Sequence, residues 1–180
     1  WVWGYGANGQ LGLNQGGPGP SLSRSSPCQI GGTWANVYGG ETGSMAVKSD
    51  GTFWIWGMNS EGRLGLNNPY PAKPRISSPA QVGTDTNWSS EDWKVDEGQG
   101  CLGAVKTDGT LWTWGNNDYG NLGQNNTTVY SSPRQIPGTT WATVSFGERT
   151  AMATKTDGTL WGWGYNVNGQ LALNGSHPTG

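Results

Sequence analysis

Hydrophobic and polar positions alternate along the chain in short stretches, and clusters of glycine, proline, asparagine and serine separate them. The stretch at 104–114, Ala-Val-Lys-Thr-Asp-Gly-Thr-Leu-Trp-Thr-Trp, is representative. Alternation with a period of two predicts β-strands, because successive side chains of a strand point to opposite faces. Asp-Gly between two such segments is the strongest short-range signal of a β-hairpin. It predicts a type I′ turn, in which both central residues have positive φ.

This hairpin belongs to an internal repeat. The motif Trp-x-Trp-Gly recurs at intervals of 53, 58 and 49 residues, at Trp1–Gly4, Trp54–Gly57, Trp112–Gly115 and Trp161–Gly164. The motif Lys-x-Asp-Gly-Thr precedes the last three of these strands, at Lys48–Thr52, Lys106–Thr110 and Lys155–Thr159. The two tryptophans of one copy lie two positions apart and share one face of their strand, so we expect them to face a packed neighbour.

Three further landmarks keep the same phase. Ser-Pro-x-Gln-Ile/Val begins at Ser26, Ser78 and Ser132. Gly-x-Leu-Gly begins at Gly9, Gly62 and Gly120, and its fourth copy reads Gly-Gln-Leu-Ala at 169–172. A further short strand upstream of each hairpin begins at Trp34, Trp93 and Trp141. About four short antiparallel strands in about 50 residues, repeated with glycine-rich turns, are typical of a β-propeller blade.

We therefore predict an all-β fold, a β-propeller of four-stranded antiparallel blades. The mean repeat of about 53 residues divides 180 residues into about three and a half blades, which are too few to close a ring. Residues 1–180 are thus expected to form part of a propeller whose remaining blades come from the same longer chain or from another subunit. The residues that we assign to the scaffold are Trp54, Trp56, Trp112, Trp114, Trp161, Trp163, Asp50, Gly51, Asp108, Gly109, Asp157 and Gly158.

Composition excludes several other classes. Leu, Ile, Val and Phe make up only about 14% of the chain, but 12 tryptophans and a net charge of −2 argue against disorder. No apolar run is long enough to span a membrane, and no signal peptide opens the chain. The ten Lys and Arg residues are scattered, and the pI is near 5.2, so we expect no nucleic acid partner.

The repeat carries a family resemblance. Asp-Gly-Thr-Leu-Trp-Thr-Trp-Gly-Asn-Asn at 108–117, with Gly-Asn-Leu-Gly at 120–123 and Ser-Pro-Arg-Gln-Ile at 132–136, resembles the repeat of the regulator of chromosome condensation family. The resemblance covers essentially the whole chain and implies a seven-bladed propeller. Its Trp-rich form is most similar to bacterial and phage-encoded members. Where eukaryotic repeats usually carry a histidine, this chain has Gly43, Cys101 and Thr150.

The resemblance implies activities only for other members of the family. Eukaryotic members include a nucleotide exchange factor for the small GTPase Ran that also binds nucleosomes, and a secreted bacterial relative inhibits β-lactamases. No motif of this chain carries either activity over, because function resides in sites and not in the fold.

No catalytic or metal site is expected. Nucleophilic and acid–base sites combine groups such as Ser, His and Asp, and the single histidine, His177, lies in the C-terminal tail. Asp50, Asp108 and Asp157 recur in register, which is compatible with acid catalysis or calcium binding, but their position in Asp-Gly turns favours a structural role. We predict no enzyme activity, no metal and no cofactor.

Other chemistry-bearing residues are few. Glu91, Asp92, Asp96 and Glu97 surround Lys94, either as a solvated rim or as a site for a cation or a basic partner. Cys28 and Cys101 occupy different positions in the repeat, which favours two thiols over a disulfide. Asn-x-Ser/Thr sequons begin at Asn87, Asn125, Asn126 and Asn174, as expected by chance in a chain rich in these residues.

Residues that break the repeat are free to serve function. Trp88 has no counterpart among the other repeat positions and lies in a loop, 83–92, that is unique to its blade. A second irregular loop, 67–75, combines prolines with Tyr, Lys and Arg. Aromatic and Arg side chains on ordered loops are common anchors of protein and glycan contacts, although Trp88 in a purely structural position is the alternative. The candidate binding residues are Trp88, Tyr70, Lys73, Arg75, Glu91 and Asp92, on loops expected at opposite faces of the disc.

The sequence thus predicts a non-enzymatic binding or structural module. The more specific hypothesis is a phage virion protein, from a tail or appendage, or a bacterial surface component. Its loops would recognise a protein or glycan on a host, or dock a neighbouring subunit. Its location would then be the virion, the cell surface or the extracellular space. The alternatives are an intracellular regulator of the guanine-nucleotide exchange factor type and a secreted protein inhibitor.

Overall fold

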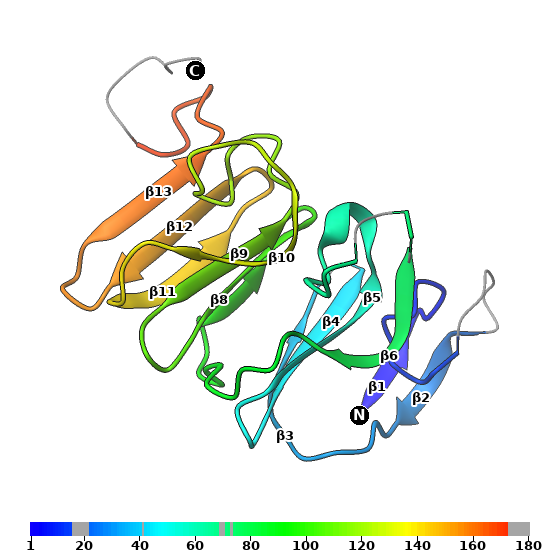
Figure 1. Cartoon of the computed structure of the whole chain (residues 1–180). Coiled ribbons are helices and arrows are strands. Elements are labelled where there is room, and N and C mark those ends of the chain that lie inside the picture. Colours follow the sequence, from blue (N-terminus) through cyan, green and yellow to red (C-terminus); the bar gives the residue numbers. More distant parts are fainter. Residues whose placement is uncertain (16–21, 41, 69–70, 73, 173–180) are drawn as a thin grey trace.

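The computed structural model describes residues 1–15, 22–40, 42–68, 71–72 and 74–172, which form β-strands and the short 3-10 turn η2 (Ser60–Gly62). The strands make four antiparallel sheets in chain order (Figure 1). The first sheet contains β1 (Val2–Gly4) and β2 (Arg24–Cys28). The second contains β3 (Trp34–Gly39), β4 (Gly43–Lys48), β5 (Phe53–Met58) and β6 (Arg75–Gln81). The third contains β7 (Val95–Glu97), β8 (Cys101–Val105), β9 (Leu111–Gly115) and β10 (Tyr130–Ile136). The fourth contains β11 (Trp141–Phe146), β12 (Thr150–Lys155) and β13 (Leu160–Gly164).

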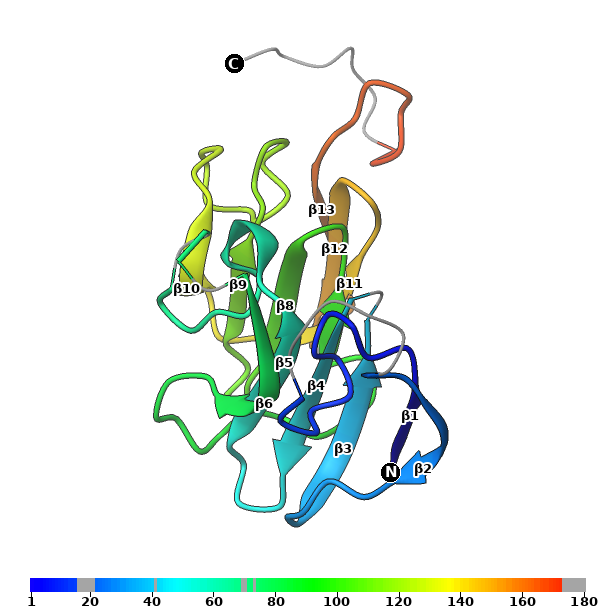
Figure 2. The same ribbon diagram turned by 90° about the vertical axis from the view of Figure 1, so that its right-hand side faces the viewer.

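The all-β prediction and the four-stranded blade are confirmed. The second and third sheets are complete blades, and the first and fourth are partial ones. Each Trp-x-Trp-Gly motif forms the third strand of its blade, so β1 and β2 hold the third and fourth places of the first unit. The first strands lie where blades meet, since β11 packs against β7 and β8. Figure 2 shows β3 and β11 on one side and β6 and β10 on the other.

The Asp-Gly turns join the second and third strands, but they are not type I′ turns. Gly51, Gly109 and Gly158 have φ of 78°, 76° and 83°, whereas the preceding aspartates are absent from the non-glycine residues with positive φ. The N–H of Gly109 donates to the carbonyl of Lys106 (3.0 Å), and the N–H of Lys106 donates to the carbonyl of Thr110 (2.9 Å). This is a three-residue hairpin loop, in which a turn is followed by one glycine in the left-handed region.

The rest of the Lys-x-Asp-Gly-Thr-x-Trp motif forms a hydrogen-bond relay. Asp108 Oδ1 accepts from the backbone N–H of Thr110 (3.0 Å) and from its hydroxyl (2.6 Å). The Trp112 indole N–H donates to the same hydroxyl (2.9 Å). These bonds, led by that of the hydroxyl, hold the pKa of Asp108 below its usual range. The relay recurs in Asp50–Thr52–Trp54 and Asp157–Thr159–Trp161.

Apolar cores form between neighbouring blades. Phe53 of β5 packs against Trp88 and against Trp114 of β9, with ring centroids 5.5 and 6.0 Å apart. All three rings are buried. A smaller core between the third and fourth sheets contains Val105, Leu111, Ile136, Trp141, Val144 and Ala153. Blades therefore bury their faces against each other, which is the main stabilising interaction expected of a stacked repeat.

A hydrogen bond locks each pair of consecutive units together. The second tryptophan of a Trp-x-Trp-Gly motif donates its indole N–H to the carbonyl of residue x in the Gly-x-Leu-Gly motif of the preceding unit. We call this contact the latch. The three latches are Trp56 to Gln10 (2.8 Å), Trp114 to Arg63 (2.9 Å) and Trp163 to Asn121 (2.9 Å). Two conspicuous sequence motifs are thus the two halves of one contact between blades.

Candidate functional site

Trp88 occupies the same position in its blade as Trp34 and Trp141 do in theirs. It forms an antiparallel bridge with Lys106, and the other two tryptophans pair with the equivalent lysines, Lys48 and Lys155. Its backbone N–H donates to the carbonyl of Gly51 in the preceding Asp-Gly turn (3.1 Å). That of Trp141 donates likewise to Gly109 (2.9 Å). The prediction that Trp88 has no counterpart is therefore wrong.

The Trp88 ring is also unavailable to a partner. It is only 3% exposed and packs against Phe53, Trp112 and Trp114. The Lys106 ammonium lies 4.6 Å from the centroid of the Trp88 ring and 4.2 Å from that of Trp112. The same lysine contacts the carboxylate of Asp85 at 2.7 Å. Trp88 thus seals the interface between two blades.

The insertion of this blade lies mainly after Trp88. Val37, Val95 and Val144 are equivalent, because they pair with Ala46, Ala104 and Ala153. Three positions separate Trp34 from Val37 and Trp141 from Val144, whereas seven separate Trp88 from Val95. Four extra residues therefore lie between Trp88 and Val95, and β7 has only three residues. We call residues 89–94 the inserted segment.

The insertion presents Trp93 to the surface. Its side chain is 74% exposed, and its φ is +66°, in the left-handed region that a bulky residue rarely adopts. The backbone around it is nonetheless fixed. The carbonyl of Trp93 accepts from the Val144 N–H of the next blade (3.0 Å), and that of Lys94 accepts from the Val105 N–H (2.7 Å). A free indole therefore stands on an anchored backbone, and the assignment of Trp93 to the repeat position of Trp34 and Trp141 is corrected.

Side chains of β3 hold the other end of the inserted segment. Asn36 donates to the carbonyl of Ser90 (2.9 Å) and to Asp92 Oδ1 (3.1 Å), and the Tyr38 hydroxyl donates to the carbonyl of Glu91 (3.1 Å). Burial raises the pKa of Tyr38, and the carboxylates of Asp92 and Glu91 add to this direction. The segment is thus tied to the preceding blade as well as to the following one.

The surface around Trp93 is a shallow groove of about 270 Å³ with two aspartates in its lining. Its lining residues are Tyr38, Asp92, Trp93, Val95, Asp96 and Val144. The Asp96 carboxylate already has a partner within the protein, because its Oδ2 accepts a hydrogen bond from the N–H of Phe146 at 2.7 Å. The exposed Glu91 carboxylate lies 3.7 Å from the Lys94 ammonium. Carboxylates beside an exposed indole make this groove suited to a cationic side chain.

The described ends of the loop at 67–75, next to η2 and at the start of β6, lie at the opposite face of the disc from the Asp-Gly turns and the inserted segment (Figure 1). Arg75 begins β6 and donates to the carbonyl of Ala7 in the first unit (3.3 Å), so it joins two units. Tyr70 and Lys73 lie outside the described residues. Among the candidate residues of this loop, the structure thus describes Arg75 alone, and its side chain contacts another unit of the scaffold.

An aromatic and cationic cluster that the sequence did not suggest lies on that opposite face. The Arg149 guanidinium is 4.8 Å from the centroid of the Tyr119 ring and 5.8 Å from that of Tyr165. The two rings meet edge to face at 5.2 Å. Tyr119 and Tyr165 come from loops of consecutive blades, so only the fold brings them together. No motif or spacing signals this cluster.

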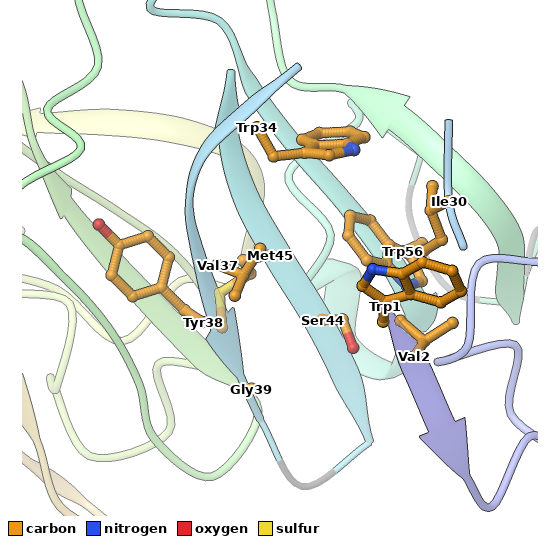
Figure 3. Close-up of a pocket in the computed structure, with 10 residues that line it drawn as sticks. All are labelled: Trp1, Val2, Ile30, Trp34, Val37, Tyr38, Gly39, Ser44, Met45 and Trp56. Carbon is orange, nitrogen blue, oxygen red and sulfur yellow. The ribbon is translucent and has the colours of Figure 1, made fainter. Parts of the chain in front are cut away.

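An apolar cavity of about 170 Å³ lies between β1 and β3 (Figure 3). Trp1, Ile30, Trp34 and Trp56 gather at one side of it, and Val37 lies on β3. Val37 is 66% exposed, whereas the equivalent Val144 is 1% exposed because it packs against β8 of the preceding blade. The cavity thus occupies the place where the first two strands of a preceding blade would pack. Its lining has the character of a blade interface.

The sequence predicts no metal site and no membrane span, and it favours two free thiols. Within the described part of the chain, no three His, Cys, Asp or Glu side chains converge as a metal site would require. The described residues also include no helix long and apolar enough to cross a membrane. Cys28 and Cys101 are free thiols, and His177 lies outside the described residues.

The fold is that of part of a β-propeller, with blades built from one repeat and an exposed insertion at a blade junction. Two family models, both described as the regulator of chromosome condensation (RCC1) repeat, match residues 108–154 and 141–170. Residues 108–170 therefore match repeats of the regulator of chromosome condensation family, as the sequence motifs predict.

Known proteins agree with this assignment. Human E3 ubiquitin-protein ligase HERC2 is 28% identical over 137 residues, which cover 74% of this chain and 3% of that protein. The match to the structure of human WBSCR16 covers 90% of this chain and 41% of that protein, with a TM-score of 0.71 and 23% sequence identity. The match to Prp20p of Saccharomyces cerevisiae covers 96% of this chain and 42% of that protein, with a TM-score of 0.74 and 19% sequence identity. The chain spans about two fifths of these solved structures and far less of the curated relative.

Proposed function

We propose that this chain is an arc of a larger propeller that binds a protein partner through the inserted segment, with Trp93 as the anchor. The observation that carries the proposal is a 74% exposed indole on a backbone held by hydrogen bonds from two blades. A rigid, exposed aromatic side chain loses little entropy on binding, and Trp is enriched among the residues that dominate binding energy.

The partner is a protein segment that carries Lys or Arg. A cation above an exposed indole gains about 0.5–1 kcal/mol, and more when water is excluded. Asp92 lines the groove with Trp93, and its side chain is exposed. Asp92 keeps one carboxylate oxygen for a partner, because the bond from Asn36 uses Oδ1. Charge complementarity therefore favours a basic segment over an acidic one.

The arc itself is a proposal about the whole molecule. The exposed Val37 and the cavity beside β1 match the face that a preceding blade covers elsewhere in the chain. We propose that the remaining blades come from the same longer chain or from another subunit. The ubiquitin ligase activity named for HERC2 is not carried over, since only 3% of that protein is matched.

A second candidate is an intracellular regulator of the exchange-factor type. The Prp20p structure is described together with binding to Gsp1p and histones, and this description favours a regulator that binds proteins. The reported relatives are human and yeast proteins, so they lend no support to a virion or surface location or to a host glycan. Those finer hypotheses stay predictions of the sequence.

Titration with a short synthetic peptide of Lys, Arg and Gly, followed by calorimetry, tests the Trp93 proposal. Trp93→Ala should weaken binding about two- to fivefold, in line with the loss of one exposed cation–π contact. Tyr119→Ala is the matched control, because it removes an exposed ring on the opposite face, and it should leave the affinity unchanged. Equal affinity of wild type and Trp93→Ala would overturn the proposal.

A charge control separates specific from diffuse attraction. Asp92→Asn should weaken binding of the basic peptide, and a peptide with Glu in place of Lys and Arg should not bind wild type. If Asp118→Asn, a change at the opposite face, weakens binding as much as Asp92→Asn does, the attraction comes from net charge and the groove is not the site.

A further inference from the structure

The three latches share a steric requirement for glycine. In each, the second glycine of Gly-x-Leu-Gly lies in the left-handed region, with φ of 65°, 65° and 66° for Gly12, Gly65 and Gly123. A Cβ placed on these glycines would lie 2.9, 2.6 and 2.9 Å from Nε1 of the docked indole. These distances are shorter than real Cβ contacts. The indole cannot retreat without losing its hydrogen bond to residue x.

The fourth copy of the motif has an alanine at this position. Ala172 has φ +52°, and its N–H donates to the carbonyl of Gly169 at 3.0 Å, as the N–H of Gly123 donates to that of Gly120 at 3.0 Å. Gly169 and Gly120 also match, with φ of 76° and 72°. The backbone of the fourth copy therefore repeats the other three. The methyl group of Ala172 consequently projects into the place where the indole of a following blade would dock.

We infer that residues 166–172 form a selective docking surface for the next blade. It accepts a blade of the same repeat type whose second-tryptophan position holds a side chain smaller than Trp, and it rejects a blade with Trp there. This inference rests on the proposal that the chain is an arc of a larger propeller. The surface is equivalent in backbone to the three latch sites, which define the chemistry of its occupant.

The rule has a direct consequence for self-assembly. Trp3 of the first unit occupies the second-tryptophan position and is 62% exposed. A second copy of the chain could present Trp3 to residues 166–172 and grow head to tail into an open filament. Ala172 blocks that contact. The residue that departs from the motif therefore fixes which blade follows and prevents the wrong one from docking, which is a known use of steric clash in specificity.

The steric rule is tested at an internal latch by a double-mutant cycle. Gly123→Ala recreates Ala172 opposite Trp163, and Trp163→Leu removes the indole. Gly123→Ala should lower the midpoint of thermal unfolding by several degrees in wild type and by clearly less in Trp163→Leu, because the cost of alanine at positive φ cancels between the two backgrounds. Equal shifts in both backgrounds would overturn the steric rule. This result does not depend on whether another blade docks on residues 166–172.

The docking surface is tested by self-association in sedimentation experiments. Ala172→Gly should strengthen head-to-tail association at least tenfold, because it removes the methyl group that excludes the Trp3 indole. Trp3→Leu should also strengthen it while Ala172 is present, because the surface accepts a side chain smaller than Trp. If either variant associates no more strongly than wild type, the inference is overturned. Peptide binding at Trp93 should be the same in these variants, so the two proposals fail separately.

Discussion

The indole N–H of Trp114 donates to the carbonyl of Arg63 across a blade junction at 2.9 Å, and Gly65, two residues after Arg63, leaves the space that the indole fills. Trp114 is fully buried. A donor of this kind that lost its acceptor would cost about 1–3 kcal/mol, so the bond is needed as much as the packing. Two motifs some 50 residues apart in the sequence are linked in this way at every junction of the chain.

Gly65→Ala should therefore destabilise the protein far more than a glycine replacement in open space. Gly83 is the matched control, because its φ of 62° is nearly the same as the 65° of Gly65, but nothing lies within 4 Å of a Cβ placed there. We expect about 1 kcal/mol for Gly83→Ala and at least about 2 kcal/mol more for Gly65→Ala, measured by urea unfolding. Equal losses would show that the indole does not need the glycine.

The Asp-Thr-Trp relay predicts a pH dependence. The pKa of Asp108 is lowered in the folded state, chiefly by the Thr110 hydroxyl, so the ionised carboxylate stabilises the fold above the unfolded pKa of about 3.9. That contribution is lost as the pH falls through the lowered pKa of the folded state. The difference in unfolding free energy between wild type and Asp108→Asn should thus shrink from pH 5 to pH 2. A constant difference over that range would contradict the role of the relay.

Lys106 should be worth more to stability than Lys155. Lys106 is buried between Trp88 and Trp112, whereas Lys155 is only partly buried between Trp141 and Trp161, and Trp161 is 48% exposed. Desolvation strengthens a cation–π contact, so Lys106→Met should cost about 2 kcal/mol and Lys155→Met about 0.5–1 kcal/mol. Chemical denaturation of the two variants beside wild type measures both. A larger loss for Lys155→Met would contradict the geometry.

The two cysteines should differ in reactivity. Burial raises the pKa of the Cys101 thiol to about 11, so hardly any thiolate forms at pH 8, and the side chain is 1% exposed. Cys28 is partly exposed. A thiol reagent at pH 8 should therefore label the native protein once, and Cys28→Ser should abolish labelling. Two rapid labelling events would mean that Cys101 is accessible.

Much of the fold could be predicted because each blade repeats the same local chemistry. The alternation around Asp108-Gly109 marks a hairpin, and the spacing of Trp-x-Trp-Gly marks the blades. The predicted type I′ turn is wrong, because Asp-Gly also suits a three-residue loop in which only the glycine has positive φ. The latch was not predicted, because no local pattern shows which carbonyl a distant indole will reach.

The sequence singles out the loop at 83–92 and Trp88 within it, whereas the exposed tryptophan of the structure is Trp93. The sequence places Trp93, with Lys94 and Val95, in the strand upstream of the hairpin, and this leaves Trp88 as the exception. The distance from Val82 to Trp88 is six positions, close to the four and five of the other blades, and this signal favours Trp88 as the repeat residue. Exposure of Trp93 depends on strand pairing at Val95, which the sequence alone does not define.

The central claim is that Trp93 is the tryptophan that meets a basic partner. The most direct measurement is a ¹⁵N–¹H NMR spectrum of the indole N–H groups during titration with the Lys/Arg peptide, with the Trp93 signal assigned by its loss in Trp93→Phe. The account predicts that this signal shifts with peptide while those of the buried Trp88 and Trp114 stay in place. A Trp93 signal that does not move at saturating peptide would contradict the account.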